Sequence, residues 1–102
     1  MNFFRKIDQM SQITLIGAEW CTPCKFLKAN IEEWAASVKC EIPIKYEEYD
    51  SEKHCVTKLP TLTYSYDGLE RQRIIGTDKT QIRVFLMNSC AYEQFSLFGY
   101  GD

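Results

Sequence analysis

The sequence predicts an α/β domain in which a four-stranded mixed β-sheet is flanked by helices. The chain has 102 residues, a length that suits one domain, and β-rich runs alternate along it with helical patterns. A strand pattern, a long helical pattern and a second strand pattern follow one another, which indicates a right-handed βαβ unit. Asp67-Gly68 separates two further β-rich runs and predicts a hairpin.

The first half of the chain supplies a short helix and the βαβ unit. Residues 2–9 are predicted to form a helix with one apolar face. Residues 12–17 are apolar on both sides, as in a central strand covered on both faces. Residues 22–38 predict an amphipathic helix, and Pro23 occupies its first turn, where a missing N–H costs nothing. The alternating run 42–50 predicts the second strand.

The second half supplies a connector, the hairpin and a last helix. The polar residues 51–58 predict a short helix or a loop, and the alternating runs 61–66 and 69–75 predict two strands. Asp78 is predicted to cap the last helix, because Gln81 follows three residues later. The buried face of this helix is expected to contain Ile82, Phe85 and Leu86.

The C-terminal residues are unusually aromatic. We predict a domain over residues 1–90 and an aromatic tail over residues 91–102 that docks on it. The side chains that make the tail apolar are Tyr92, Phe95, Leu97, Phe98 and Tyr100.

Composition and charge argue against several kinds of protein. The net charge of −2, from 12 basic and 14 acidic residues, provides no basic surface for a nucleic acid or an anionic membrane. No apolar run approaches the roughly 20 residues of a membrane span. The N-terminus lacks the features of a secretory signal, so a cytoplasmic location is expected. The protein is also expected to be a monomer. Five cysteines cannot all pair within one chain, which favours one working dithiol over a disulfide scaffold.

Cys21-Thr22-Pro23-Cys24 lies where the first predicted strand meets the long helix. The N–H groups and the positive dipole end of a helix N-terminus favour the thiolate form of Cys21, which is therefore the predicted nucleophile. Cys24, one helical turn further on, is the predicted resolving thiol. Thr22 and Pro23 are expected to influence the reduction potential of this redox-active pair.

Four landmarks resemble the thioredoxin family over about residues 12–90. Residues 18–25 (AEWCTPCK) are similar to its active-site segment, and Leu59-Pro60-Thr61 resembles its loop with a cis-proline. Asp67-Gly68 and Gly76 match its hairpin turn and the glycine before its last helix. The resemblance implies a thioredoxin fold that lacks the first strand of full-length members, as in small thioredoxin- and glutaredoxin-like redoxins.

The resemblance also implies a thiol–disulfide oxidoreductase that reduces protein disulfides and has no bound cofactor. Electrons would come from NADPH through a thioredoxin reductase, or from glutathione, and ribonucleotide reductase is one partner of such proteins. The substrate-binding residues that it implies are Trp20, Thr22, Pro23, Leu59, Pro60, Thr61, Gly76, Thr77 and Asp78. Two alternatives stay open: a glutathione-dependent glutaredoxin-like reductase, because residues 75–78 are similar to a glutathione-binding segment, and a non-enzymatic interaction subunit.

The sequence departs from the family at two positions near the dithiol. Leu15 stands where members have a buried aspartate that assists the resolving thiol, and Tyr46 stands where they have a lysine. Glu19 and Glu48 are candidate substitutes for the acid. We therefore expect slower resolution of mixed disulfides than in relatives that keep the aspartate.

Metal binding and further thiol chemistry are weaker interpretations of the remaining residues. A zinc site would need two ligands besides Cys21 and Cys24, and no second C-x-x-C motif supplies them, so no metal is predicted. His54 is interpreted as a surface residue rather than the partner of a nucleophilic Cys55. Cys40, Cys55 and Cys90 are interpreted as packing or surface thiols, with a regulatory role as the alternative.

Overall fold

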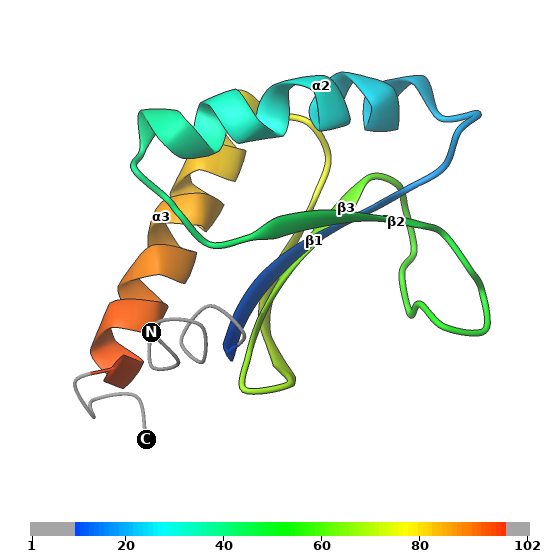
Figure 1. Cartoon of the computed structure of the whole chain (residues 1–102). Helices are drawn as coiled ribbons and strands as arrows, with labels where there is room; N and C mark the ends of the chain where they lie inside the picture. Colours follow the sequence, from blue (N-terminus) through cyan, green and yellow to red (C-terminus); the bar gives the residue numbers. More distant parts are fainter. Residues whose placement is uncertain (1–9, 98–102) are drawn as a thin grey trace.

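The computed structural model of the chain describes residues 10–97, and its centre is a four-stranded sheet with two helices packed on it (Figure 1). The elements are β1 (Ser11–Gly17), α2 (Thr22–Ser37), β2 (Ile44–Glu48), β3 (Thr61–Tyr66), β4 (Leu69–Ile75) and α3 (Lys79–Leu97). The predicted mixed sheet flanked by helices is confirmed. The helix predicted at residues 2–9 lies outside the described residues.

The sheet has the order β2-β1-β3-β4, with β1 parallel to β2 and antiparallel to β3. β1 is therefore a central strand, and its apolar residues are buried on both faces, as its composition predicts. Leu15 lies opposite Tyr46, and Gly17 lies opposite Glu48. This register places the C-terminal ends of β1 and β2 side by side, next to the start of α2.

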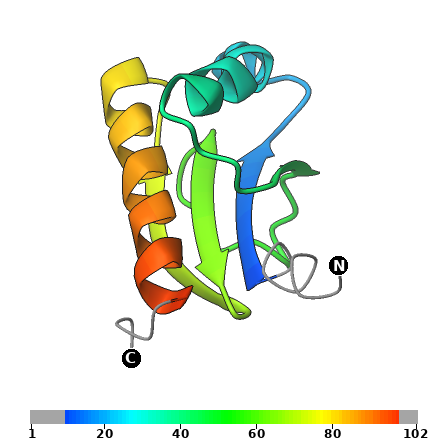
Figure 2. The same ribbon diagram turned by 60° about the vertical axis from the view of Figure 1, so that its left-hand side comes forward.

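One hydrophobic core joins both helices to the same face of the sheet (Figure 2). Alternate residues of β1 and β3 point toward the helices, since side chains alternate between the faces of a strand. The buried members are Ile13, Leu15, Leu27, Ile31, Trp34, Ala35, Cys40, Ile42, Leu62, Tyr64, Ile82, Phe85 and Leu86. The predicted buried faces of both helices are thus confirmed.

Local signals fix the ends of the elements. Asp67 and Gly68 both have positive φ angles, 56° and 80°, which is the backbone of a tight hairpin turn. The Asp78 carboxylate accepts the Gln81 N–H at 2.9 Å and caps α3. β2 is shorter than the predicted strand 42–50, although Tyr49 still donates its N–H to the Gly17 carbonyl.

Residues 91–97 and residues 51–58 clarify two predictions about the ends of elements. α3 continues through residues 91–97, because no glycine or proline interrupts it, and Tyr92 contacts the rings of Tyr64 and Tyr66. Residues 51–58 form turns and a loop rather than a helix. Within residues 10–97, no helix combines the length and apolar character that crossing a bilayer requires.

Candidate active site

Cys21 and Cys24 form a disulfide at the N-terminus of α2, directly after the C-terminal end of β1. Their Cα atoms are 5.2 Å apart, within the usual range for a disulfide. Cys21 is the N-cap residue, with an extended backbone, and its Sγ accepts the Cys24 N–H at 3.2 Å. The predicted dithiol therefore lies at a helix N-terminus, where N–H groups and the helix dipole stabilise a thiolate.

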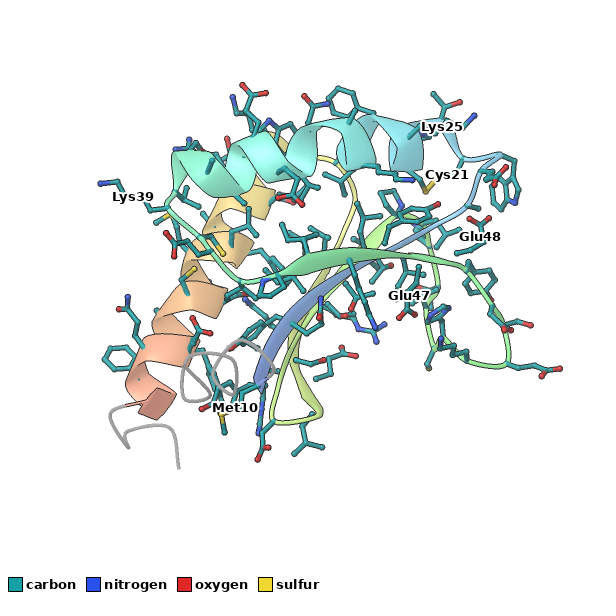
Figure 3. The ribbon with its side chains drawn as sticks, viewed as in Figure 1. Met10, Cys21, Lys25, Lys39, Glu47 and Glu48 are labelled. Atoms are coloured by element: carbon teal, nitrogen blue, oxygen red, sulfur yellow. A yellow bond between two sulfur atoms is a disulfide. The ribbon has the colours of Figure 1, made fainter. Side chains whose placement is uncertain are left out.

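The two sulfur atoms differ in accessibility. Cys21 is 6% exposed and Cys24 is fully buried, so Cys21 is the sulfur that a substrate can reach. Trp20 is 78% exposed and forms a prominent apolar projection beside them. Figure 3 shows Cys21 and Lys25 at the start of α2, with Glu48 near the loop that leads to Cys21.

A cavity of about 320 Å³ opens beside the dithiol and has Cys21 in its wall. Trp20 and Leu59, two of the predicted substrate-binding residues, line it. Its other lining residues are Tyr49, Val56, Thr57 and Lys58, which the sequence analysis did not single out. These residues come from a connector with no periodic pattern, so no sequence signal marks them as part of the site.

The Pro60 loop faces the dithiol from the start of β3. The Leu59–Pro60 peptide bond is cis, and the Leu59 side chain packs against Ala18, Cys21 and Cys24. The Pro60 carbonyl accepts the Gly76 N–H at 3.0 Å, which ties this loop to the end of β4. Thr61 is buried and donates its hydroxyl to the Lys58 carbonyl at 2.6 Å.

The remaining predicted binding residues lie at two places. Thr22 and Pro23 are exposed in the first turn of α2, between the cysteines. Gly76 adjoins the Pro60 loop, whereas Thr77 and Asp78 precede α3 and do not line the cavity beside Cys21. Since the Asp78 carboxylate caps α3, it is already engaged within the chain.

Gly17 is a contact position that the sequence analysis missed. A Cβ atom on Gly17 would lie 2.9 Å from the Cβ and 3.2 Å from the Sγ of Cys24. It would also lie 3.2 Å from Cε1 of Tyr46. The absence of a side chain at Gly17 therefore leaves a space that both the Tyr46 ring and Cys24 border.

The buried-acid position is apolar, and polar groups gather beside it on β2. Leu15 is 1% exposed and belongs to the core. The Tyr46 hydroxyl donates to Glu48 Oε1 at 3.2 Å, and Glu48 Oε2 accepts the Glu19 N–H at 3.0 Å. Burial raises the pKa of Tyr46, and the neighbouring Glu48 and Glu19 charges raise it further.

The opposite face of the sheet holds a separate polar cluster. His54 Nε2 lies 2.8 Å from Glu47 Oε1, and His54 Nδ1 accepts the Asp50 N–H at 3.0 Å. His54 is partly buried, with its side chain 8% exposed, so it is less exposed than the predicted surface histidine, and it pairs with Glu47 rather than with Cys55. Lys45 also contacts Glu47, at 2.8 Å. These contacts organise the connector after β2.

The other cysteines lie apart from the dithiol. Cys40 is buried in the core, Cys90 is partly buried on α3, and Cys55 is exposed. Across the described residues, no three His, Cys, Asp or Glu side chains are grouped closely enough to hold a metal ion.

Comparison with known proteins gives a consistent result. The family model for thioredoxin matches residues 1–88, which include Cys21, Cys24 and Pro60. A thioredoxin of Chlamydia caviae is 32% identical over 75 residues, covering 70% of this chain and 74% of that protein. A thioredoxin of Staphylococcus aureus is 29% identical over 80 residues, covering 74% and 77% respectively. The crystal structure of thioredoxin from Trypanosoma brucei brucei superimposes with a TM-score of 0.64 at 26% identity, covering 89% of this chain and 86% of that one.

Proposed function

The chain belongs to the thioredoxin family and is a thiol–disulfide oxidoreductase, and from this premise we propose that it reduces disulfides in proteins. Members of the family use a redox-active cysteine pair without a bound cofactor. One observation carries the proposal: Cys21 caps α2, lies in the wall of an apolar cavity, and is bonded to a fully buried Cys24. This arrangement makes the Cys21 sulfur accessible to a substrate and keeps the Cys24 sulfur buried until the resolving step.

The reaction consists of two thiol–disulfide exchanges. The Cys21 thiolate attacks one sulfur of the substrate disulfide, forms a mixed disulfide and releases the first substrate thiolate. Cys24 then loses its proton and attacks Cys21 Sγ, which breaks the bond to the substrate and releases the second thiolate. The substrate gains two electrons, and Cys21–Cys24 becomes a disulfide.

The geometry favours Cys21 in the first step. In the reduced protein, the Cys24 N–H that now reaches Cys21 Sγ can donate to the Cys21 thiolate, as a cap does at a helix N-terminus. Trp20 and Leu59 provide an apolar surface on which side chains next to a substrate disulfide can be buried. Protein disulfides, which bring such side chains, fit this site better than small hydrophilic disulfides.

We further propose that thioredoxin reductase, supplied with NADPH, regenerates the dithiol. Glutathione is the alternative donor, but Asp78 in the segment similar to a glutathione site already caps α3, which favours the reductase. Ribonucleotide reductase is one protein whose disulfide such a reductant can reduce. The free Cys55 thiol on the surface suits a reducing compartment, so we place the activity of the monomer in the cytoplasm.

The test is reduction of insulin disulfides by wild-type protein and by Cys21→Ser, with NADPH and thioredoxin reductase in one assay and glutathione with glutathione reductase in the other. We expect turnover with the wild type, none with Cys21→Ser, and faster turnover in the first assay. Cys55→Ser is the matched control, because it removes an exposed thiol away from the helix terminus. Equal activity of Cys21→Ser and wild type would refute the enzymatic role and favour an interaction subunit.

The reduction potential of the pair separates a reductant from an oxidant. A value near −270 to −200 mV, roughly the range of thioredoxins and glutaredoxins, supports the proposal. A value near about −120 mV would instead indicate an oxidant.

A further inference from the structure

The resolving step needs a proton acceptor that the core around Cys24 does not provide. Cys24 is fully buried among Ala18, Cys21 and Leu59, and Leu15 occupies the position of the family's buried acid. A thiol must become a thiolate before it attacks a disulfide, so the proton of Cys24 must leave a site without solvent contact. The question is which polar group reaches this sulfur.

Tyr46 is a polar side chain that the sheet places next to Gly17, on the side of Cys24. Its ring carbon Cε1, which adjoins the carbon that bears the hydroxyl, lies 3.2 Å from the point where a Gly17 Cβ would stand. Cys24 Sγ lies 3.2 Å from the same point. The edge of the phenol ring and the sulfur therefore both border the space that Gly17 leaves open.

Glu48 connects this phenol to solvent. Its two carboxylate oxygens are held by the Tyr46 hydroxyl and by the Glu19 N–H, so the carboxylate has a fixed position beside the loop that leads to Cys21 (Figure 3). Glu48 is nevertheless exposed and can exchange protons with water. Lys28 of α2 lies 4.2 Å from the centre of the Tyr46 ring and adds a positive charge over the ring face.

We propose that Tyr46 and Glu48 form the proton relay of the resolving thiol, replacing the buried acid that Leu15 removes. This inference rests on the proposed function. When Cys21 carries the substrate, the Cys24 proton passes to the Tyr46 oxygen, directly or through one water, as the Tyr46 hydroxyl proton passes to Glu48. Cys24 Sγ then bonds to Cys21 Sγ, the bond from Cys21 to the substrate sulfur breaks, and that sulfur leaves with the electron pair. Glu48 returns the proton to solvent.

The raised pKa of Tyr46 supports a relay rather than a charged base. A phenol that stays protonated at neutral pH can donate to the Glu48 carboxylate while it accepts from the thiol. Glu19 contributes its backbone N–H and its charge, whereas no contact joins its side chain to the hydroxyl of Tyr46 among the described interactions. Of the two candidate acids, the geometry therefore favours Glu48.

The experiment separates the two chemical steps by stopped flow. Reduced protein in a Cys55→Ser background is mixed with a substoichiometric amount of 5,5′-dithiobis(2-nitrobenzoate), and nitrothiobenzoate release is followed by absorbance. The first phase reports attack by Cys21, and the second reports resolution by Cys24. Tyr46→Phe and Glu48→Gln test the relay. Glu47→Gln is the matched control, because it neutralises the neighbouring carboxylate on the opposite face of the sheet.

We expect Tyr46→Phe and Glu48→Gln each to slow the second phase about 100-fold at pH 7, the lower end for general base catalysis. The first phase should change less than about twofold, and the double variant should be no slower than either single one, since the groups act in series. In the variants, the second-phase rate should rise about tenfold per pH unit below the thiol pKa, because free thiolate becomes the nucleophile. The wild-type rate should be flatter.

Each possible result decides between the two hypotheses. Loss of the first phase in the wild type would refute the proposed function itself. A normal first phase with a second phase unchanged in both variants would overturn the relay and leave the function intact. An equal slowing in Glu47→Gln would also overturn it, because the effect would then follow charge or stability rather than position. Rescue by Glu48→Asp, with its retained carboxylate, would support the relay.

Discussion

Substitution of Gly17 by alanine tests the close approach between the sheet and the dithiol. The added methyl group would meet Cys24 Cβ at 2.9 Å and both Cys24 Sγ and Tyr46 Cε1 at 3.2 Å. Contacts between carbon atoms are optimal at about 3.5–4.0 Å, so all three are too short. The Tyr46 ring is only partly buried and can move outward, whereas Cys24 is fixed by α2 and by its disulfide.

Two opposing contributions set the change in the free energy of unfolding caused by Gly17→Ala. Overpacking of one methyl group costs about 1–3 kcal/mol. Replacing glycine by alanine restricts the unfolded chain and returns about 0.4–1 kcal/mol. We therefore expect Gly17→Ala to lower the free energy of unfolding of the oxidised protein by about 1–2 kcal/mol, which corresponds to a fall in Tm of roughly 4–15 °C for a domain of this size.

The reduced protein should tolerate the methyl group better, because Cys24 Sγ is then free to rotate. If the oxidised form is destabilised by about 1 kcal/mol more than the reduced form, the reduction potential becomes less negative by about 20 mV. The measurements are urea unfolding of both redox forms and the potential in glutathione buffers.

Gly68→Ala is the control for Gly17→Ala. It strains a residue with a φ of 80° but has no heavy atom within 4 Å of the new Cβ. It should lower stability about equally in both redox forms and leave the potential unchanged. A Gly17→Ala protein as stable as the wild type, with the same potential, would refute the reasoning.

Three further predictions concern stability, pH and thiol reactivity. Leu15→Asp places a carboxyl group at a core position that is 1% exposed, so it should lower the free energy of unfolding in urea by about 3–5 kcal/mol. In a Glu48→Gln background, Leu15→Asp should restore part of the rate at which Cys24 resolves the mixed disulfide. An unchanged rate near neutral pH would count against this prediction. Hydrogen bonds from Lys45 and His54 lower the pKa of Glu47 from 4.5 to about 2, so the stability that Glu47 contributes is present above pH 4.5 and is lost as the pH falls toward 2. Glu47→Gln should remove about 1 kcal/mol of this acid-sensitive stability. The free energy of unfolding of the variant should therefore change less between pH 5 and pH 2 than that of the wild type. Burial and contact with Cys40 raise the pKa of Cys90 to about 12, so iodoacetamide at pH 8 should alkylate the exposed Cys55 well before Cys90. Mass spectrometry of the alkylated protein gives the order of the two reactions. The reverse order would contradict the packing of Cys90.

Features that depend on neighbouring residues in the chain were predictable from the sequence. The period of the apolar residues placed α2, Asp67-Gly68 placed the hairpin, and Asp78 with Gln81 placed the start of α3. Cys21 and Cys24 were predictable because the motif and the helix that activates it are contiguous. Each of these signals acts within a few residues, where elementary stereochemistry decides the outcome.

Features that depend on packing between distant segments were not predictable. Tyr49 and Lys58 border the cavity only because the connector after β2 returns toward the dithiol. His54 is partly buried where Glu47 and the Asp50 N–H contact its two ring nitrogens. The hydrogen bond between the Tyr46 and Glu48 side chains joins residues two apart on β2. Its position on the side of Cys24 follows only from the pairing of β1 with β2.

Leu15 and Tyr46 depart from the family pattern, and together with Gly17 they form one structural unit. A carboxylate at position 15 would need a nearby cation, and the paired position on β2 holds Tyr46 instead of a lysine. The Tyr46 ring in turn needs the space that Gly17 provides next to Cys24. Because the phenol hydroxyl then reaches Glu48 at the exposed end of β2, the proposed relay lets a proton leave the buried thiol without an ionised acid in the core. Introducing an aspartate at position 15 alone would therefore create an unpaired buried acid, not the family's arrangement of an acid with its cation.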